Sequence, residues 1–226
     1  MSVSRRNRSR KSLTLVAAAA ALVLSSCGGT APGVAAEVDG RTINATEVDD
    51  FARVLCALDG EAAATAPSKG VRFRALEILL SIELSRAVVD FDRADSAKVA
   101  EAVNQSASTR EMVPADVREI FDRAVKEYAQ AQLAITELGD DSLRERGQSS
   151  PDEQDAFVEG DRLRTAYAAS GDVEVDRRFG ELDNGMLVRS AGSLSVPVSD
   201  TAVQGVAMEP TADFLEGIPA SQTCGG

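Results

Sequence analysis

Paired carboxylates are the side chains in this sequence whose type and spacing could support acid–base chemistry or cation binding. They occur at Asp49-Asp50, Asp140-Asp141 and Asp152-Glu153. These pairs fall at predicted helix starts or in predicted loops, where capping or a solvated face explains them. The segment "ELDNGM" at 181–186 offers a few oxygen ligands around a glycine but lacks the others that a calcium loop needs. We interpret it as a turn.

Histidine is absent from the chain. Ser-His-Asp and Cys-His catalysis are therefore excluded, together with most zinc sites. We predict that the protein is not an enzyme, with no catalytic residue, no cofactor and no metal site.

The first 26 residues have the features of an export signal. Five basic residues and no acidic ones precede or flank an apolar segment of twelve residues, Leu13 to Leu24. A membrane-spanning helix needs about 20 residues, so this segment is too short to remain as an anchor. The tetrapeptide "LSSC", Leu24 to Cys27, then resembles a bacterial lipobox, in which the cysteine is acylated before the signal is removed.

This pattern predicts a lipoprotein anchored to the extracytoplasmic face of the cell membrane through acyl chains, such as palmitate, on Cys27. The alternative is that Cys27 is an ordinary small residue near a cleavage site. Loss of the signal's basic residues changes the formal charge from −12 to −17, which makes a nucleic-acid partner improbable. We expect the domain itself to contact the membrane only through the lipid anchor.

If Cys27 carries lipid, the two remaining cysteines form an even pair in an oxidising compartment. A disulfide between Cys56 and Cys224 would then join the first helix to the C-terminal end, with a stabilisation of roughly 4 to 5 kcal/mol in the chain-entropy model. Two free thiols are the alternative, because the sequence does not fix the distance between them.

The first folded unit is predicted to be a β-hairpin followed by a capped helix. Asp39-Gly40 is a two-residue turn signal between apolar runs. Asn44 or Thr46 is expected to cap a helix that ends near Gly60, and Glu47, three residues after Asn44, would complete a capping box. The hairpin alone would be marginal in water, so we expect the later strand "DVEVDRRF" to pair with it.

Between these strands the apolar periodicity predicts mainly helix. The expected helices cover residues 68–91, a segment that is apolar on more than one side; 96 to about 108; a long helix with Pro114 in its first turn and Gly139 at its end; and a last one from Pro151 to Gly171. A short strand is expected over 193–200, and an extended tail over 201–226. The predicted fold is mainly α, a bundle of about five helices closed by a small β-sheet that pairs the N-terminal hairpin with a C-terminal strand.

Two short motifs in this order resemble the SurA/PrsA group of extracytoplasmic foldases, most closely actinobacterial lipoproteins with a SurA N-terminal domain and no parvulin domain. The first motif is carried by Ala36, Val38, Asp39, Gly40, Ile43 and Val48, and the second by Val173, Val175, Asp176, Arg178, Phe179 and Gly180. Arg177 stands where the family often has proline. The resemblance divides the chain into a signal peptide (1–26), a lipidated tether (27–35), a chaperone domain (36–200) and the tail.

Membership of this group implies a holdase chaperone for unfolded secreted or envelope polypeptides. Prolyl isomerase activity is not expected, since the parvulin site uses paired histidines and the segment from Gly139 to Pro151 is too short to hold that domain. The candidate polypeptide-binding residues are Leu80 and Leu84, which lie off the main apolar stripe of the long helix, and Phe91 beyond it. The alternative role for each is core packing. The alternative function is an envelope interaction module that binds one specific protein partner.

Overall fold

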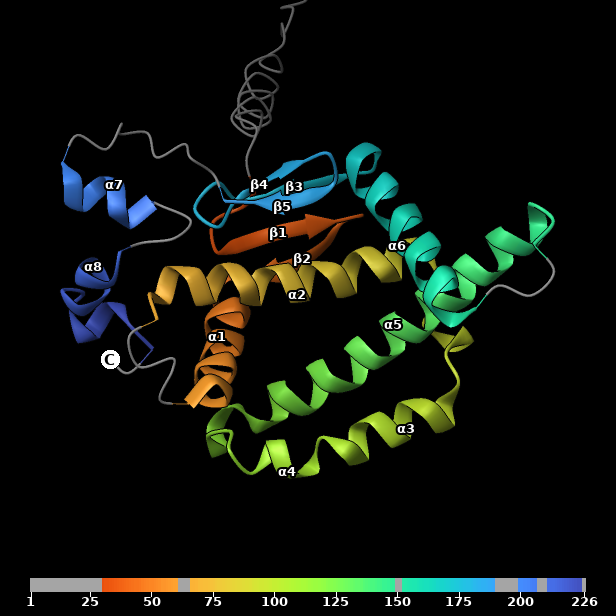
Figure 1. Cartoon of the computed structure of the whole chain (residues 1–226), viewed down its shortest axis with the longest axis horizontal. Coiled ribbons are helices and arrows are strands. Elements are labelled where there is room, and N and C mark those ends of the chain that lie inside the picture. The colour runs from red at the N-terminus through yellow and green to blue at the C-terminus, as the bar shows by residue number, and fades with distance from the viewer. Residues whose placement is uncertain (1–29, 61–65, 149–151, 190–198, 207–210, 225–226) are drawn as a thin grey trace, which may run out of the picture.

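A computed structural model describes residues 30–60, 66–148, 152–189, 199–206 and 211–224. The protein is mainly helical, with small antiparallel sheets along one side of the helices (Figure 1). The predicted fold class is therefore confirmed. The predicted signal peptide and Cys27 lie outside the described residues.

The N-terminal hairpin forms as predicted from strands β1 (Val34–Val38) and β2 (Arg41–Asn44). Its turn residues Asp39 and Gly40 have φ values of 52° and 75°, the left-handed conformation of both central positions in a type I′ turn. Glycine adopts this conformation without strain and aspartate is one of the few side chains that tolerate it. The turn therefore fixes the register that places Ala36 and Val38 against the helices.

The late strand β3 (Val173–Val175) pairs antiparallel with β1, and the sheet order is β2-β1-β3. Val38 lies opposite Val173, and Ala36 lies opposite Val175. Backbone hydrogen bonds extend the ladder at both ends, from Asp39 N to Asp172 O (3.0 Å) and from Asp176 N to Ala35 O (2.9 Å). The prediction that the two ends of the helical sequence meet in one sheet is confirmed.

The described part of the segment predicted as a lipidated tether (27–35) begins at Thr30 and is folded. The Thr30 hydroxyl donates to Val34 O (3.3 Å) and to Asp176 Oδ2 (3.4 Å). Val34 N donates to Ala31 O, and Ala45 N donates to Gly33 O. Glycine and threonine composition suggested a linker, but these local and long-range hydrogen bonds attach the segment to the domain from Thr30 onward.

Helix α1 (Ala45–Asp59) begins after Asn44 and ends at Gly60, whose φ is 57°. The predicted capping box does not form, since the Asn44 side chain makes no capping hydrogen bond. Glu47 instead accepts a hydrogen bond from Arg123 (3.0 Å) on a later helix. A tertiary ion pair has replaced the local cap.

Helix α2 (Ser68–Val88) lies centrally, between the sheet on one side and the long helix α5 (Arg118–Glu145) on the other (Figure 1). The expectation that it is apolar on more than one side is confirmed by its buried residues, which are Val71, Ala75, Leu76, Leu79, Leu80, Ile82, Leu84 and Ser85. It is followed by the short 3-10 helix η2 (Phe91–Arg93).

Helices α3 (Ser96–Gln105) and α4 (Ala107–Arg110) lie on the side of α5 away from α2 (Figure 1). Asp95 caps α3 by accepting from Ala97 N (2.8 Å). Pro114 then precedes the short turn η3 (Ala115–Val117), from which α5 continues.

The predicted end of α5 at Gly139 is wrong, because the helix continues to Glu145. A Cβ on Gly139 would lie 1.8 Å from the carbonyl oxygen of Ala156 on helix α6 (Glu153–Ser170). The glycine therefore permits close helix packing and does not terminate the helix. Helix α6 ends before Gly171 as predicted, and Asp152 caps its start by accepting from Asp155 N (2.7 Å).

The apolar core has two parts. The larger one joins the three-stranded sheet to α1, α2 and the first half of α5, with Val38, Val48 and Leu76 among its most buried members. The smaller one lies at the other end of α2, where Ile82 and Ile135 pack together. Both parts combine residues from distant segments, so the lobe folds through non-local contacts.

A second hairpin, β4 (Glu181–Asp183) and β5 (Met186–Val188), follows β3. Its turn residues Asn184 and Gly185 have φ values of 50° and 80°. The interpretation of "ELDNGM" as a turn is confirmed.

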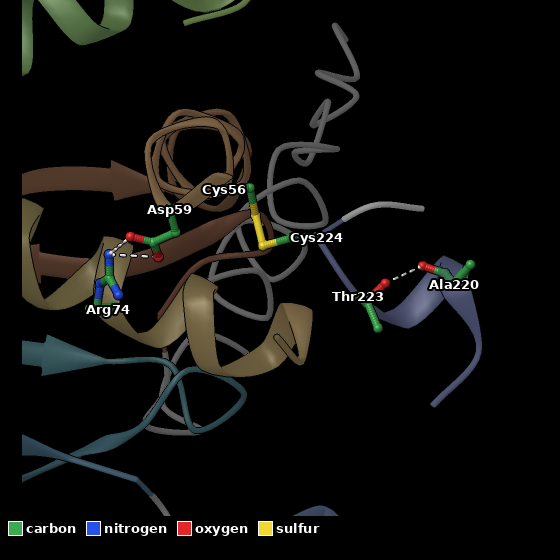
Figure 2. Close-up of a disulfide and its surroundings, with 6 residues drawn as sticks. All are labelled: Cys56, Asp59, Arg74, Ala220, Thr223 and Cys224. Carbon is green, nitrogen blue, oxygen red and sulfur yellow. Dashed lines mark hydrogen bonds and ion pairs between the residues drawn. A yellow bond between two sulfur atoms is a disulfide. The ribbon is translucent and has the colours of Figure 1, made fainter. Parts of the chain in front are cut away.

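The disulfide between Cys56 and Cys224 forms, with Cα atoms 5.4 Å apart (Figure 2). It is reinforced by a hydrogen bond from Cys224 N to Ala66 O (3.2 Å) and by a bridge between Pro67 and Thr223. In the same region Arg74 on α2 pairs with Asp59 at the end of α1 (3.1 Å) (Figure 2).

The C-terminal segment is not fully extended as predicted. It contains helices α7 (Asp200–Val206) and α8 (Ala212–Glu216) and the 3-10 turn η4 (Ala220–Gln222). Thr211 caps α8 by accepting from Phe214 N, a local signal that a search for apolar periodicity does not detect. The strand predicted over 193–200 lies almost wholly outside the described residues, and Asp200 belongs to α7.

Candidate functional site: two hollows on the helical lobe

The predicted polypeptide-binding residues are buried in the core. Leu80 is 2% exposed, Leu84 6% and Phe91 9%. Leu80 and Leu84 belong to the larger core and Phe91 to the smaller one. In this conformation their side chains pack in the core, which was the alternative role for each residue. The three do not form one exposed surface.

Phe91 nevertheless contributes to the wall of a shallow hollow of about 520 Å³ at the end of α2. The guanidinium of Arg86 lies over the Phe91 ring, 4.9 Å from its centre. The hollow is lined by Arg41, Arg86, Ala87, Val88, Val89, Asp90 and Phe91. Three of these lining residues, Arg41, Arg86 and Asp90, are charged.

Glu83 lies between the arginines of this region. Arg86 donates to its Oε1 (2.6 Å), while its buried Oε2 accepts no hydrogen bond from a described residue and lies 3.8 Å from Nη1 of Arg41. Burial raises the pKa of Glu83, against the opposing effect of Arg86 and Arg41. The neighbouring carboxylate of Glu127, which pairs with Arg86 at 3.3 Å, also opposes ionisation of Glu83. The balanced charges make this hollow a poor site for a simple anion.

A second hollow, of about 430 Å³, lies between α5 and α6. We call it the α5–α6 groove; it is lined by Gln132, Leu133, Thr136, Glu153, Gln154 and Phe157. The side chains of Leu133 and Phe157 are half-buried, so each retains surface that a ligand can cover. Amide, hydroxyl and carboxylate groups beside two apolar side chains match the chemistry of a polypeptide, whose backbone both donates and accepts hydrogen bonds.

Each of the two helices also carries a large exposed apolar side chain outside the groove lining. Tyr128 lies one turn before Gln132 on α5 and is 44% exposed, and Val158 follows Phe157 on α6 and is also exposed.

Polar contacts outside the groove lining also join α5 to α6. Glu159 of α6 is buried and accepts hydrogen bonds from the Ser142 hydroxyl (2.9 Å) and from Arg162 (2.8 Å), and it pairs with Arg146 (2.9 Å). These donors, Arg162 first, hold the pKa of Glu159 at about 2. Its carboxylate therefore remains charged and joins the two helices at neutral pH.

Helix α6 is also attached to α2 through polar groups. Arg164 donates to the hydroxyls of Ser81 and Ser85, and it pairs with Asp161. The Ser85 hydroxyl donates to Ser81 O (2.7 Å). Because Ser85 is fully buried, this interaction fixes the position of α6 against α2.

Two of the three carboxylate pairs bind arginines, and in the third Asp152 caps α6. Asp49 pairs with Arg72, Asp140 with Arg144, and Asp141 with Arg93. Among the described residues, no cluster of three or more His, Cys, Asp or Glu side chains is placed to hold a metal ion. Within the same described ranges, no helix combines the length and the apolar content that crossing a bilayer requires.

Sequence reasoning missed Leu133 and Phe157. Leu133 falls outside the apolar stripe of α5, which passes through Phe121, Ala124, Ala131 and Ile135. The criterion that selected Leu80 and Leu84, an apolar residue off the main stripe, would have found Leu133 if applied to this helix. This criterion selects a surface residue on α5, which has one buried face, but selects core residues on α2, which is buried on several sides.

Comparisons with protein-family models, with curated proteins and with solved structures found no match to this chain. The SurA/PrsA resemblance therefore depends on the two motifs quoted above.

Proposed function

We propose that this protein is a lipid-anchored extracytoplasmic chaperone of the SurA/PrsA type, which holds unfolded secreted or envelope polypeptides without isomerising their prolines. The lipobox supplies the anchor at Cys27 and the location. The two motifs of the resemblance lie on β1–β2 with the start of α1 and on β3 with the turn after it, and the sheet they share closes the helical lobe. The absence of histidine from the sequence supports a binding role over a catalytic one.

The observation that carries the proposal is the α5–α6 groove. Its lining combines the apolar side chains of Leu133 and Phe157 with the amide side chains of Gln132 and Gln154. An extended polypeptide can place an apolar side chain against Leu133 and Phe157 while its backbone groups bond to the amides. The binding residues we propose are therefore these four, in place of the buried Leu80 and Leu84.

A second candidate function is an envelope interaction module with one protein partner. It is favoured by the distribution of the large exposed apolar side chains. Those among the described residues lie on separate elements and are Met112, Tyr128, Val158, Met186 and Val203. A holdase usually needs a broader contiguous apolar surface than one groove, whereas a single partner does not.

An aggregation assay separates the two functions. The mature protein is mixed at near-stoichiometric ratio with several unrelated denatured proteins, and light scattering is followed over time. Protection of most of these clients supports the chaperone. Protection of none supports the single-partner module, whose partner would then be sought by capture from an envelope extract.

The groove itself is tested with Leu133→Gln. The matched control is Met112→Gln, the same kind of change at an exposed apolar residue on another element. We expect loss of protection in the first variant and retention in the second, with both keeping the helical circular dichroism of the parent. Equal protection by both variants would show that the groove is not the binding surface.

A further inference from the structure

We infer that the edge of the three-stranded sheet formed by β3 lies directly on the membrane surface. Arg177 and Arg178, in the turn after β3, then lie against anionic lipid headgroups. This inference rests on the proposed lipid anchor at Cys27 and goes beyond it. The anchor alone specifies that the protein is attached to a bilayer. The structure adds which face of the domain meets the bilayer.

Few residues separate the proposed anchor from the described part of the chain. Thr30 is the first described residue, and its hydroxyl bonds to Val34 O and to Asp176 Oδ2. Only Gly28 and Gly29 separate it from Cys27. Three Cα–Cα links of 3.8 Å span roughly 11 Å at most. A domain on so short a connection stays at headgroup level and cannot present any chosen face to the bilayer.

The carboxylate of Asp176 joins Thr30 to Arg178. Asp176 Oδ2 accepts from both the Thr30 hydroxyl and Nη2 of Arg178 (2.7 Å). Arg178 N also donates to Asp176 Oδ1 (2.8 Å), which fixes the turn after β3. The arginine and the start of the folded chain therefore share one carboxylate. Arg178 also holds the pKa of Asp176 below its ordinary value, which keeps this link charged.

The turn after β3 carries two exposed arginines. The Arg178 side chain is 65% exposed despite its ion pair. Arg177 is exposed and makes no hydrogen bond or ion pair with a described residue. Each arginine near an anionic bilayer is attracted to it, while the mature chain as a whole, at −17, is repelled. Asp176 pairs with Arg178, and Glu174 is exposed on β3 itself, so of the two arginines only Arg177 has a charge that no described carboxylate pairs with. Its attraction to anionic headgroups acts where the short connection already holds the domain beside the lipid.

The orientation has a consequence for the helices. Helices α3 and α4 lie on the side of the molecule opposite the sheet (Figure 1). With the sheet end on the bilayer, these helices point into the aqueous compartment. The domain itself then contacts the membrane, whereas the sequence led us to expect contact only through the lipid anchor.

The test uses tryptophan, because the chain contains none and a single substitution gives the only indole. Full-length protein is produced in a host that processes lipoproteins and is reconstituted in vesicles of phosphatidylcholine and phosphatidylglycerol that contain lipid with a nitroxide headgroup. Glu174→Trp places the reporter on β3, and Glu101→Trp places it on α3; both side chains are exposed. We expect strong quenching at position 174 and essentially none at 101.

Two further variants test the cause. Insertion of a long Gly/Ser segment after Gly29 should abolish most of the quenching at position 174. Arg177→Glu should reduce that quenching on anionic vesicles and leave it unchanged on pure phosphatidylcholine. Lys126→Glu, the same charge reversal at an exposed residue of α5, is the matched control and should have no effect.

Equal quenching at the two positions in lipidated, vesicle-bound protein would overturn the orientation and leave the anchor intact. Protein that has no attached lipid by mass and does not float with vesicles would overturn the anchor and the orientation together. Mass analysis and flotation therefore distinguish failure of the inference from failure of the proposed function.

Discussion

Gly139 of α5 and Gly160 of α6 face each other where the two helices cross. A Cβ at Gly139 would lie 2.6 Å from the backbone nitrogen of Gly160, and a Cβ at Gly160 would lie 2.0 Å from the carbonyl oxygen of Ile135. Both glycines are buried in helices. The two backbones are therefore in direct contact, which positions the walls of the α5–α6 groove.

Gly139→Ala should destabilise the protein by about 3 kcal/mol or more, since the added methyl meets backbone that cannot move alone. The matched control is Gly70→Ala in α2, where the nearest atom to the new Cβ is the end of the flexible Arg189 side chain at 3.4 Å. That change should be neutral or stabilise by roughly 0.5–1 kcal/mol, because alanine favours a helix. Chemical denaturation measures both. Equal stability of the two variants would contradict the close contact.

The disulfide is the main attachment of the C-terminal segment, in which no described residue from Ser199 onward is buried. Replacing Cys56 and Cys224 by serine should cost up to about 4 to 5 kcal/mol, the chain-entropy value for a loop of this length. The helical circular dichroism of the lobe should persist at low temperature. Reductant should lower the midpoint of the parent and have no effect on the double variant.

The pH dependence of stability should depend in part on Glu159. Its folded pKa of about 2 lies below the ordinary 4.5, so its stabilisation is fully present above the unfolded value and is lost as pH falls between the two. Glu159→Gln should therefore lower the thermal midpoint at neutral pH, and the difference from the parent should shrink as pH falls from 4.5 toward 2.

The control for this change is Glu145→Gln, an exposed carboxylate at the end of the same helix pair. It should leave the midpoint nearly unchanged at every pH. A constant difference between parent and Glu159→Gln across the acid range would mean that the carboxylate charge is not what joins α5 to α6.

Much of the fold was predictable because its signals are local. The turn at Asp39-Gly40, the start of α2 and the end of α6 at Gly171 follow from turn and terminator residues. The pairing of Val38 with Val173 was predictable because few β-like runs exist in a helical sequence. The disulfide followed from counting cysteines, given lipid on Cys27.

The remaining features depend on tertiary contacts. Gly139 has the composition of a helix end, and only the approach of Ala156 makes it a packing residue. Leu84 lies off the main stripe of α2 but is buried because the helix is covered on several sides. Glu47 matches a capping box, yet Arg123, 76 positions later, takes its carboxylate.

Cys27→Ser should remove the lipid and release the protein from the membrane fraction, or leave the signal uncleaved, since the modified cysteine is required at that position of a lipobox. Mass analysis of the N-terminus and fractionation check this. Cys56→Ser, which breaks the disulfide and leaves the lipobox unchanged, should remain in the membrane fraction. A Cys27→Ser protein with unchanged mass and fractionation would disprove the anchor.

Two truncations separate the contribution of β3 from that of the segment behind it. Deletion from Ser199 onward removes the disulfide and a segment in which no side chain with described burial is itself buried, so this protein should be close in stability to the reduced parent.

Deletion from Asp172 onward also removes Val173 and Val175, which pair with β1, and Phe179, which is buried in the larger core with Arg72 over its ring at 5.0 Å. The hairpin then becomes a two-stranded ribbon with an open edge, which is marginal in water. Because β1 packs on α1 and α2, the loss should lower the thermal midpoint of the whole lobe and its helical signal, well below the Ser199 truncation. If both truncated proteins unfold at the same temperature under reducing conditions, β3 does not close the fold.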